Sequence, residues 1–178
     1  MAESAAAIRI DEIRDPEELT IITRLAEKIF PATYADLIPA EQIPYMLPLM
    51  YGKAVLRWEF ASGVKFALIR DGDLPIGYIS WHSADGGRAM RLEKLYLDFA
   101  YHHLSIGKLA LEYVISCARR SGANYISLNV NKGNLRALKA YCRVGFYCWY
   151  SEKEDIGNGF FKDDYVMRYD LTPAAEVR

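Results

Sequence analysis

The sequence predicts one α/β domain built on a mixed, mostly antiparallel sheet of about seven strands. Two kinds of segment predict this class. In some, apolar residues alternate with a period of two, as in strands, and in others they recur at steps of three and four, as in amphipathic helices. The segments follow in the order strand, helices, three strands, helix, strand, helix and two strands. This order combines antiparallel hairpins with strand-helix-strand connections, which a mixed sheet needs.

The first half of the chain begins with a strand at residues 8–13 (IRIDEI), and Asp15-Pro16 then opens a helix. Pro31 is expected to end or bend that helix. Hairpin signals at Asp71-Gly72-Asp73 and turn residues at 85–87 separate the strands that follow. The other expected elements are helices after Pro39 and over 52–62, strands over 64–70, 75–82 and 89–97, a long helix, a strand over 125–130, a short helix over 135–144, and strands over 146–151 and 165–171.

Residues 92–108 (LEKLYLDFAYHHLSIGK) join an apolar strand to an amphipathic helix through a short polar loop. The helix is expected to start near Leu104 or Ser105, because apolar residues keep helical spacing from Ile106 onward. The first amide groups of a helix have no acceptor within it, and the positive end of the helix dipole lies behind them. The loop therefore predicts an anion pocket, with Gly107 leaving room for a phosphate. An ordinary connection without a ligand is the alternative for this segment alone.

Composition excludes several classes of function. The chain has 178 residues, of which 52% are hydrophobic and 25% charged, with a formal net charge of -1, so it offers no basic field for nucleic acid. It lacks an apolar run long enough to cross a membrane and a basic, apolar leader, and we expect a cytoplasmic protein. Cys117, Cys142 and Cys148 are odd in number and lack metal-ligand spacing, which predicts reduced thiols in the core.

Residues 128–146 (LNVNKGNLRALKAYCRVGF) form a second strand, a short helix and a Gly-Phe pair. Together with the loop described above, this segment resembles the GNAT superfamily of acyl-CoA-dependent N-acyltransferases, and the resemblance covers both halves of that family's cofactor site. The family's second motif reads Asn, two residues, Ala, three residues, Tyr, three residues, Gly-Phe. It is complete here as Asn134, Ala137, Tyr141, Gly145 and Phe146.

The resemblance implies a single GNAT-type acetyltransferase domain over residues 1–178, with helices on both faces of the sheet and acetyl-CoA as co-substrate. Two central strands of this fold splay apart, and the pantetheine arm of the cofactor enters between them. Relatives are often homodimers, so a homodimer is implied as well. The positions implied to bind the cofactor are Leu95, Leu97, His102, His103, Leu104, Ser105, Ile106, Gly107, Lys108, Asn134 and Tyr141.

The family's phosphate loop is altered in this chain. The usual pattern is Gln or Arg, two residues, Gly, any residue, then Gly or Ala, and here His102 and Ser105 stand at the first two of these positions, whereas Gly107 is retained. We expect His102 to contact the pyrophosphate and His103 to face solvent. Since adjacent residues point apart and His82 is the only other histidine, the histidines predict no metal site.

The resemblance also implies roles in catalysis. The amide of Leu95 is expected to hold the thioester carbonyl as it becomes an oxyanion, and Tyr141 to protonate the departing thiolate. An alkylamine with a pKa of about 10.4 must first lose a proton, at a cost of about 4 to 5 kcal/mol at neutral pH. Glu93, on the same strand face as Leu95 by alternation, is the candidate base, directly or through water. The alternative for Glu93 is a solvated ion pair with Arg91.

The acceptor pocket of this family is formed by the helices after the first strand and by the last strands. Four candidate acceptor residues there, Tyr34, Glu41, Tyr45 and Asp164, are acidic or aromatic, which suits a cationic amine. Pieces such as residues 155–167 (DIGNGFFKDDYVM) resemble a bacterial subgroup near the polyamine N-acetyltransferases. We therefore expect an enzyme that acetylates a primary amine of a small, polyamine-like molecule. A protein or peptide N-acetyltransferase and a catalytically silent acyl-CoA sensor remain the alternatives.

Overall fold

The computed structural model describes residues 8–102 and 104–171. Their secondary structure follows the predicted order, and the seven strands are hydrogen-bonded in the order β1-β2-β3-β4-β5-β7-β6. The elements are β1 (Ile8–Glu12), α1 (Leu19–Tyr34), α2 (Gln42–Tyr51), α3 (Lys53–Ala61), β2 (Lys65–Asp71), β3 (Leu74–Ala84), β4 (Ala89–Leu97), α4 (Ile106–Arg120), β5 (Tyr125–Asn131), α5 (Leu135–Val144), β6 (Tyr147–Gly157) and β7 (Phe160–Asp170), with short 3-10 turns at Pro16–Glu18, Asp85–Gly87 and Phe99–Tyr101. The prediction of a seven-stranded α/β fold is confirmed.

Two boundaries differ from the prediction. Pro31 lies inside α1, which continues to Tyr34, and the hydroxyl of Thr33 donates a hydrogen bond of 2.8 Å to the carbonyl of Ile29 in this last turn. Strands β6 and β7 extend up to the turn at Asn158 and Gly159, both with positive φ, as a two-residue hairpin requires. The predicted strands covered only 146–151 and 165–171, although Asn-Gly is a strong hairpin signal.

The contacts of the chain divide it into two compact units. The first comprises the described parts of residues 1–80 and 94–110, and the second comprises residues 81–93 and the described part of 111–178. Strands β3 and β4 and helix α4 contribute to both units. Each unit is described by itself below.

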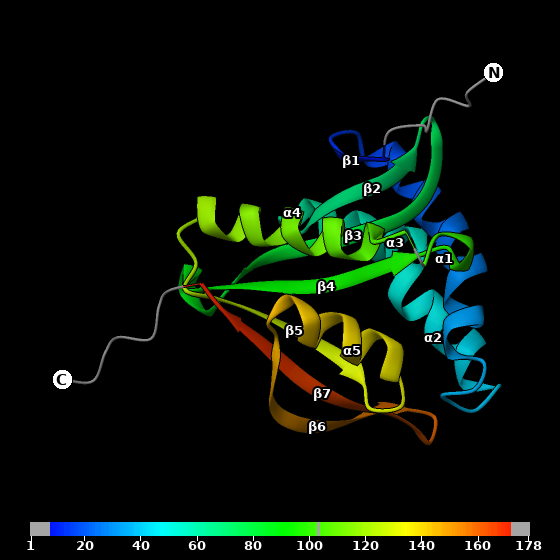
Figure 1. Cartoon of the computed structure of the whole chain (residues 1–178). Coiled ribbons are helices and arrows are strands. Elements are labelled where there is room, and N and C mark those ends of the chain that lie inside the picture. The colour runs from blue at the N-terminus through cyan, green and yellow to red at the C-terminus, as the bar shows by residue number, and fades with distance from the viewer. Residues whose placement is uncertain (1–7, 103, 172–178) are drawn as a thin grey trace. The chain divides into compact units, whose positions relative to one another are not determined.

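The first unit contains β1, β2 and helices α1 to α3 (Figure 1). Strands β1 and β2 are antiparallel, with Ile8 opposite Asp71 and Glu12 opposite Ala67. An aromatic cluster links α1, α2, β3 and β4, because rings from these four elements lie within 4.5–6.4 Å of one another. Its members are Phe30, Tyr34, Tyr51, Tyr78 and Tyr96.

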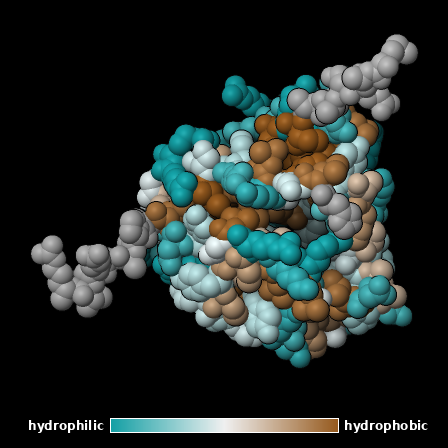
Figure 2. All heavy atoms as spheres, viewed as in Figure 1, coloured by the Kyte–Doolittle hydropathy of each residue, from teal (hydrophilic) through white to brown (hydrophobic). Residues whose placement is uncertain are grey.

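The second unit contains β5, β7 and β6 as an antiparallel sheet, together with α5 and most of α4 (Figure 1). Val114 and Ala118 of α4 are buried, as their helical spacing predicts, and Leu111, outside the predicted face, is buried as well. Trp81 packs edge-on against Tyr113. Figure 2 shows that apolar side chains also reach the viewed surface, between charged ones. In this unit the exposed large apolar residues include Leu135, Tyr147, Trp149, Tyr150 and Phe161.

The cysteines are free, but the prediction of core thiols is wrong for two of them. Cys117 is half-buried, whereas Cys142 and Cys148 are exposed, because α5 and β6 turn these positions toward solvent. Within residues 8–102 and 104–171, no group of three or more His, Cys, Asp or Glu side chains could hold a metal ion. The helices of the same residues include none that is long and apolar enough to cross a membrane.

Candidate active site

The loop between β4 and α4 is fixed by Asp98, in the first unit. The carboxylate of Asp98 accepts a hydrogen bond of 3.2 Å from the amide of Ala100 and forms an ion pair with Lys28 of α1. The amide of Asp98 donates to the carbonyl of Ile76 over 2.8 Å, which ties the loop to β3. The ammonium of Lys28 lowers the pKa of Asp98, so the carboxylate stays ionised. The sequence analysis missed both residues of this pair; an Asp directly after a strand was the available signal for a cap.

The start of α4 has the form expected of a phosphate loop. Ser105 adopts a left-handed conformation with φ of 58°, and Ile106 begins the helix. A Cβ built on Gly107 would meet no heavy atom within 4 Å, so the space beside its backbone is open. The amides of a first helical turn point out of the helix end, and an anion at this end is favoured by the dipole.

Ser105 stands where the family pattern has glycine, and its conformation shows why. A non-glycine residue in the left-handed region costs about 1–2 kcal/mol, whereas glycine adopts it freely. We expect Ser105→Gly to raise the free energy of unfolding by up to about 1 kcal/mol after the greater entropy of glycine in the unfolded chain is subtracted. Urea unfolding measures this change, with Ser116→Gly in α4 as the control that should lose stability. A destabilised Ser105→Gly variant would contradict the strain.

His102 makes a contact that the sequence did not predict. Its Nε2 lies 2.7 Å from the carbonyl of Leu97 and must donate to it, since a carbonyl only accepts. The ring also packs on Phe99, with centroids 4.5 Å apart. The side chain of His102 therefore bonds to the backbone of its own loop. The acceptor is the carbonyl of Leu97, one of the backbone groups expected to bind pantetheine. His103 lies outside the described residues.

The second motif is organised around the C-terminal end of α5, in the second unit. Gly145 has φ of 116° and ends the helix, with its amide and that of Phe146 both donating to the carbonyl of Tyr141. A side chain at Gly145 would lie 3.1 Å from the ring of Tyr169. Glycine is therefore required for two reasons, the positive φ and the lack of space. The buried ring of Phe146 contacts the rings of Tyr141 and Tyr169. This packing fixes the position of Tyr141, whose side chain is half-buried.

Asn134, the first residue of that motif, caps α5. Its side-chain oxygen accepts a hydrogen bond of 3.2 Å from the amide of Ala137. The Asn-x-x-Ala spacing thus has a structural reason in the helix cap. The role in cofactor binding expected for Asn134 is separate from this contact.

Strands β4 and β5 are parallel over their first residues, with Ala89 opposite Tyr125 and Leu92 opposite Leu128. Leu95 and Leu97, the expected partners of pantetheine, lie beyond this paired stretch of β4.

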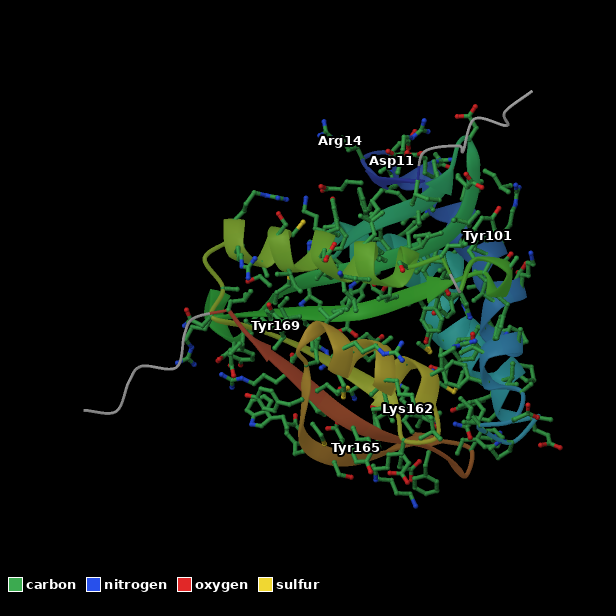
Figure 3. All side chains as sticks on the ribbon, in the orientation of Figure 1. Asp11, Arg14, Tyr101, Lys162, Tyr165 and Tyr169 are labelled. Carbon is green, nitrogen blue, oxygen red and sulfur yellow. The ribbon has the colours of Figure 1, made fainter. Side chains whose placement is uncertain are left out.

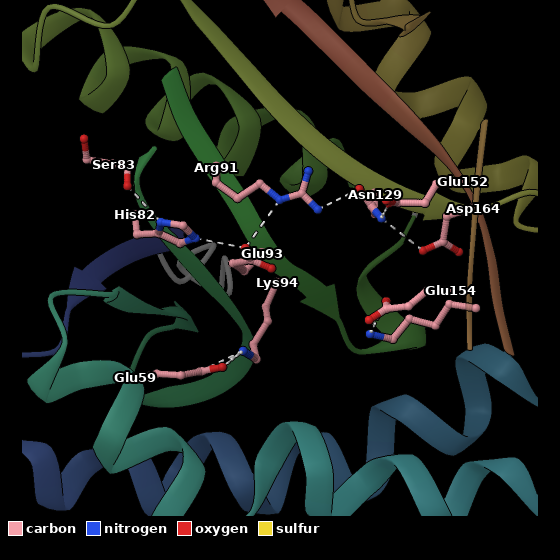
Figure 4. Close-up of polar contacts among 11 residues, drawn as sticks. Glu59, His82, Ser83, Arg91, Glu93, Lys94, Asn129, Glu152, Glu154 and Asp164 are labelled. Carbon is pink, nitrogen blue, oxygen red and sulfur yellow. Dashed lines mark hydrogen bonds and ion pairs between the residues drawn. The ribbon is translucent and has the colours of Figure 1, made fainter. Parts of the chain in front are cut away.

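A chain of polar contacts crosses the second unit (Figure 4). The Oε1 atom of Glu93 lies 2.9 Å from Nε2 of His82 and 3.3 Å from Nε of Arg91. A terminal nitrogen of Arg91 then donates to Oδ1 of Asn129 over 2.6 Å. The ion pair with Arg91 that formed the alternative for Glu93 is present, and His82 is an additional partner that the sequence analysis missed.

Lys94, the residue after Glu93, forms a buried ion pair in the first unit. Its Nζ lies 2.9 and 3.0 Å from the two carboxylate oxygens of Glu59 in α3, and 5.9 Å from the centroid of the Tyr51 ring. Only 5% of the Lys94 side chain is exposed. Removal of one partner would leave a charge in the core, which typically costs about 3–5 kcal/mol. No local sequence pattern relates residues 35 positions apart.

The candidate acceptor residues fall in different units. Tyr34, Glu41 and Tyr45 belong to the first, where the hydroxyl of Tyr34 lies 3.0 Å from that of Tyr96. Glu41 is exposed and precedes α2, and Tyr45 is half-buried within α2. Asp164 belongs to β7 in the second unit. It is 9% exposed, and burial, as the largest influence, raises its pKa.

The parallel pairing of β4 with β5 and the capped Asn-to-Gly-Phe helix α5 agree with the resemblance to acyl-CoA-dependent N-acyltransferases drawn from the sequence. The chain belongs to the acetyltransferase (GNAT) family, whose model matches residues 22–146. It is therefore an N-acetyltransferase. No curated protein sequence matches the chain.

Solved structures share this fold. The PaiA N-acetyltransferase from Thermoplasma acidophilum in complex with coenzyme A is 23% identical, with a TM-score of 0.76 over 92% of this chain and 99% of that one. A GCN5-related N-acetyltransferase from Rhodopseudomonas palustris is 18% identical, with a TM-score of 0.75 over 96% and 99% of the two chains. YncA from Salmonella typhimurium, a putative acetyltransferase solved with acetyl-CoA, is 17% identical, with a TM-score of 0.66 over 95% and 96%.

Proposed function

We propose that the protein transfers the acetyl group of acetyl-CoA to a primary amine of a small cationic molecule, with a polyamine-like acceptor preferred. The observation that carries this proposal is that two carboxylates lie close to the same side-chain amide, that of Asn129. Nδ2 of Asn129 lies 3.1 Å from Oε2 of Glu152 and 3.5 Å from Oδ2 of Asp164, on the adjacent strands β6 and β7. Two carboxylates side by side repel each other, and an ammonium group relieves that repulsion.

The surroundings of this carboxylate pair add more acidic side chains. Glu154 of β6 lies 3.5 Å from Nζ of Lys162, and Asp163 forms an ion pair with Lys132. Figure 3 shows Lys162 and Tyr165 along β7. The lysines balance the outer carboxylates, which leaves the buried Asp164 as the acid best suited to bind a cation. We further assign Tyr34, Glu41 and Tyr45 to the acceptor side of the site.

For the chemical step we assign three groups. The amide of Leu95 stabilises the oxyanion that forms from the thioester carbonyl, Glu93 takes the proton of the amine directly or through water, and Tyr141 protonates the departing thiolate. The half-buried setting of Tyr141 supports its role, because its hydroxyl is attached to a ring fixed by Phe146. We assign the cofactor to Leu97, to the loop up to Lys108 and to Asn134.

A thiol-release assay with acetyl-CoA over polyamines, amino acids and peptides tests the proposal. We expect polyamines to give the highest kcat/KM, and Glu152→Gln to raise the KM for polyamines while leaving that for acetyl-CoA unchanged. A higher kcat/KM for peptides would support the peptide alternative. Binding of acetyl-CoA without turnover of any acceptor would support the sensor.

Asp164 also gives a prediction of stability against pH. Because its pKa in the folded protein is raised, its contribution to stability is present at low pH and is lost as the pH rises from the ordinary value of 3.8 through the raised value. The ionised form is the costly one, so Asp164→Asn should become progressively more stable than the wild type over this rise in pH. Urea unfolding at a series of pH values measures the difference. A difference that stays constant or shrinks would show that Asp164 does not titrate in this way.

A further inference from the structure

His82 and Glu93 are arranged to share one proton. Nδ1 of His82 lies 2.9 Å from the carbonyl of Ser83, and Nε2 lies 2.9 Å from Oε1 of Glu93 (Figure 4). A carbonyl oxygen can only accept, so Nδ1 carries a hydrogen. In the neutral imidazole Nε2 is then an acceptor and faces another acceptor. The contact becomes a hydrogen bond only when the pair holds one further proton.

The arrangement therefore fits the imidazolium form of His82, in which both N–H groups have an acceptor. Arg91 lies 3.3 Å from the same Oε1 atom and favours the ionised form of Glu93. With Glu93 ionised, the added proton resides on Nε2 of His82. About a third of each side chain is exposed, 33% for His82 and 36% for Glu93, so protons can exchange with solvent between turnovers.

We propose that His82 is a positioning residue for acetyl transfer that receives, through Glu93, the proton released by the acceptor amine. This inference rests on the proposed role of Glu93 as base. Before the step, the pair has released its shared proton to solvent, so His82 is neutral with its hydrogen on Nδ1 and Glu93 is ionised. One N–H bond of the ammonium breaks, its proton passes to Glu93, and a proton passes from Glu93 to Nε2 of His82. The amine nitrogen keeps its electron pair for attack on the thioester.

The remaining protons balance without a further reactant. Attack forms the C–N bond and places a negative charge on the thioester oxygen, and loss of the thiolate breaks the C–S bond. The thiolate takes a proton from the hydroxyl of Tyr141, and the amide nitrogen loses its second proton to restore that hydroxyl. The net products are the acetylated amine, the thiol and one proton, which His82 holds until solvent removes it.

Further charged groups of the second unit surround His82 and Glu93. Arg91 of β4 contacts Glu93 directly, and Asn129 of β5 connects Arg91 to Glu152 of β6 and Asp164 of β7. A proton on His82 therefore adds a cation to a chain that already carries one arginine and the three carboxyl groups of Glu93, Glu152 and Asp164. The carboxyl groups reduce the repulsion between the imidazolium and Arg91.

Two substitutions separate proton transfer from mere support. In His82→Gln the side-chain amide can still donate to Glu93 but cannot accept a proton, whereas His82→Ala does neither. We expect both variants to lose about tenfold in kcat, with an unchanged KM for acetyl-CoA, and His82→Gln to lose the acid-side inflection of the pH profile. The double variant His82→Gln/Glu93→Gln should lose no more than Glu93→Gln alone. Full activity of His82→Gln, with a wild-type pH profile, would overturn the proposal.

The matched control is Lys65→Gln, which removes an exposed ion pair with Glu12 in the first unit and should leave kcat unchanged. The assay uses whichever amine in the panel reacts best, because every amine releases the same proton. A second readout does not need turnover: the chain has three histidines, so ¹⁵N NMR of the imidazole rings can be assigned with one variant of each. We expect the Nε2 signal of His82 to differ between the wild type and Glu93→Gln, whereas the Nδ1 signal, which reports the contact with Ser83, should stay the same. Identical Nε2 signals would overturn the shared proton, whereas failure of every amine would overturn only the proposed acceptor chemistry.

Discussion

Gly107→Ala is expected to make the protein more stable and its binding of acetyl-CoA weaker. Alanine is favoured over glycine by about 1 kcal/mol inside a helix, and a Cβ at this position meets no other part of the chain within 4 Å. The same methyl group would occupy the open space beside the first-turn amides. Loss of a hydrogen bond to a charged phosphate costs about 1.5–3 kcal/mol, which corresponds to a loss of about 10- to 100-fold in affinity.

Calorimetric titration with acetyl-CoA and urea unfolding of the free protein measure the two effects of this substitution. The control is Arg119→Ala, an exposed position in the last turn of the same helix, which should change the affinity little. A Gly107→Ala variant that binds acetyl-CoA as tightly as the wild type would show that the cofactor phosphates do not approach this turn. A loss of stability in the same variant would contradict the open space beside Gly107.

Tyr141→Phe is expected to lower kcat by about 100-fold or more while acetyl-CoA still binds. The substitution removes only the hydroxyl, and the ring can keep its contact with Phe146, so the end of α5 should stay intact. A positioned general acid contributes about 10²- to 10⁴-fold to rate. Steady-state kinetics with the best acceptor, together with calorimetry of acetyl-CoA binding, separate the chemical step from binding.

A matched control for Tyr141 is Tyr147→Phe, at the start of β6. The hydroxyl of Tyr147 donates to Asp170 over 2.8 Å on the exposed side of the sheet, so its loss should leave kcat close to the wild-type value. Retention of full turnover by Tyr141→Phe would remove this residue from the mechanism and leave the thiolate to be protonated by water.

The order of the elements and most of their bounds could be predicted from the sequence, because periodicity and turn residues act locally. The second motif illustrates this. Asn134 caps the start of α5 and Gly145 ends the helix, and both residues are needed for local reasons that the spacing of the motif indicates. The hairpin at Asn158 and Gly159 is equally local, and the predicted strands stopped short of it although Asn-Gly is a turn signal. The exposure of Cys142 and Cys148 could not be predicted, since an apolar-looking segment does not show which face a neighbour covers.

The polar contacts of the candidate site were much harder to predict than the fold. Lys94 contacts Glu59, 35 residues away in the sequence, and Arg91 contacts Asn129, 38 residues away. The local sequence does not indicate either partner. His82 was considered only as a metal ligand. Its contact with Glu93 depends on the pairing of two strands, which the local sequence does not show. The bond between Nε2 of His102 and the carbonyl of Leu97 was not predicted either. Sequence patterns indicate which residue types are present, whereas tertiary packing decides which of them meet.

Binding of the cofactor diphosphate by the main chain at the start of α4 can be tested most directly by amide NMR. Coenzyme A and pantetheine share the pantetheine arm, but only coenzyme A carries the diphosphate. Titration with coenzyme A should shift the amide signals of Ile106 and Gly107, and titration with pantetheine should leave these two signals unchanged. Signals that stay fixed with coenzyme A, or that move equally with both compounds, would contradict a diphosphate site at this helix end.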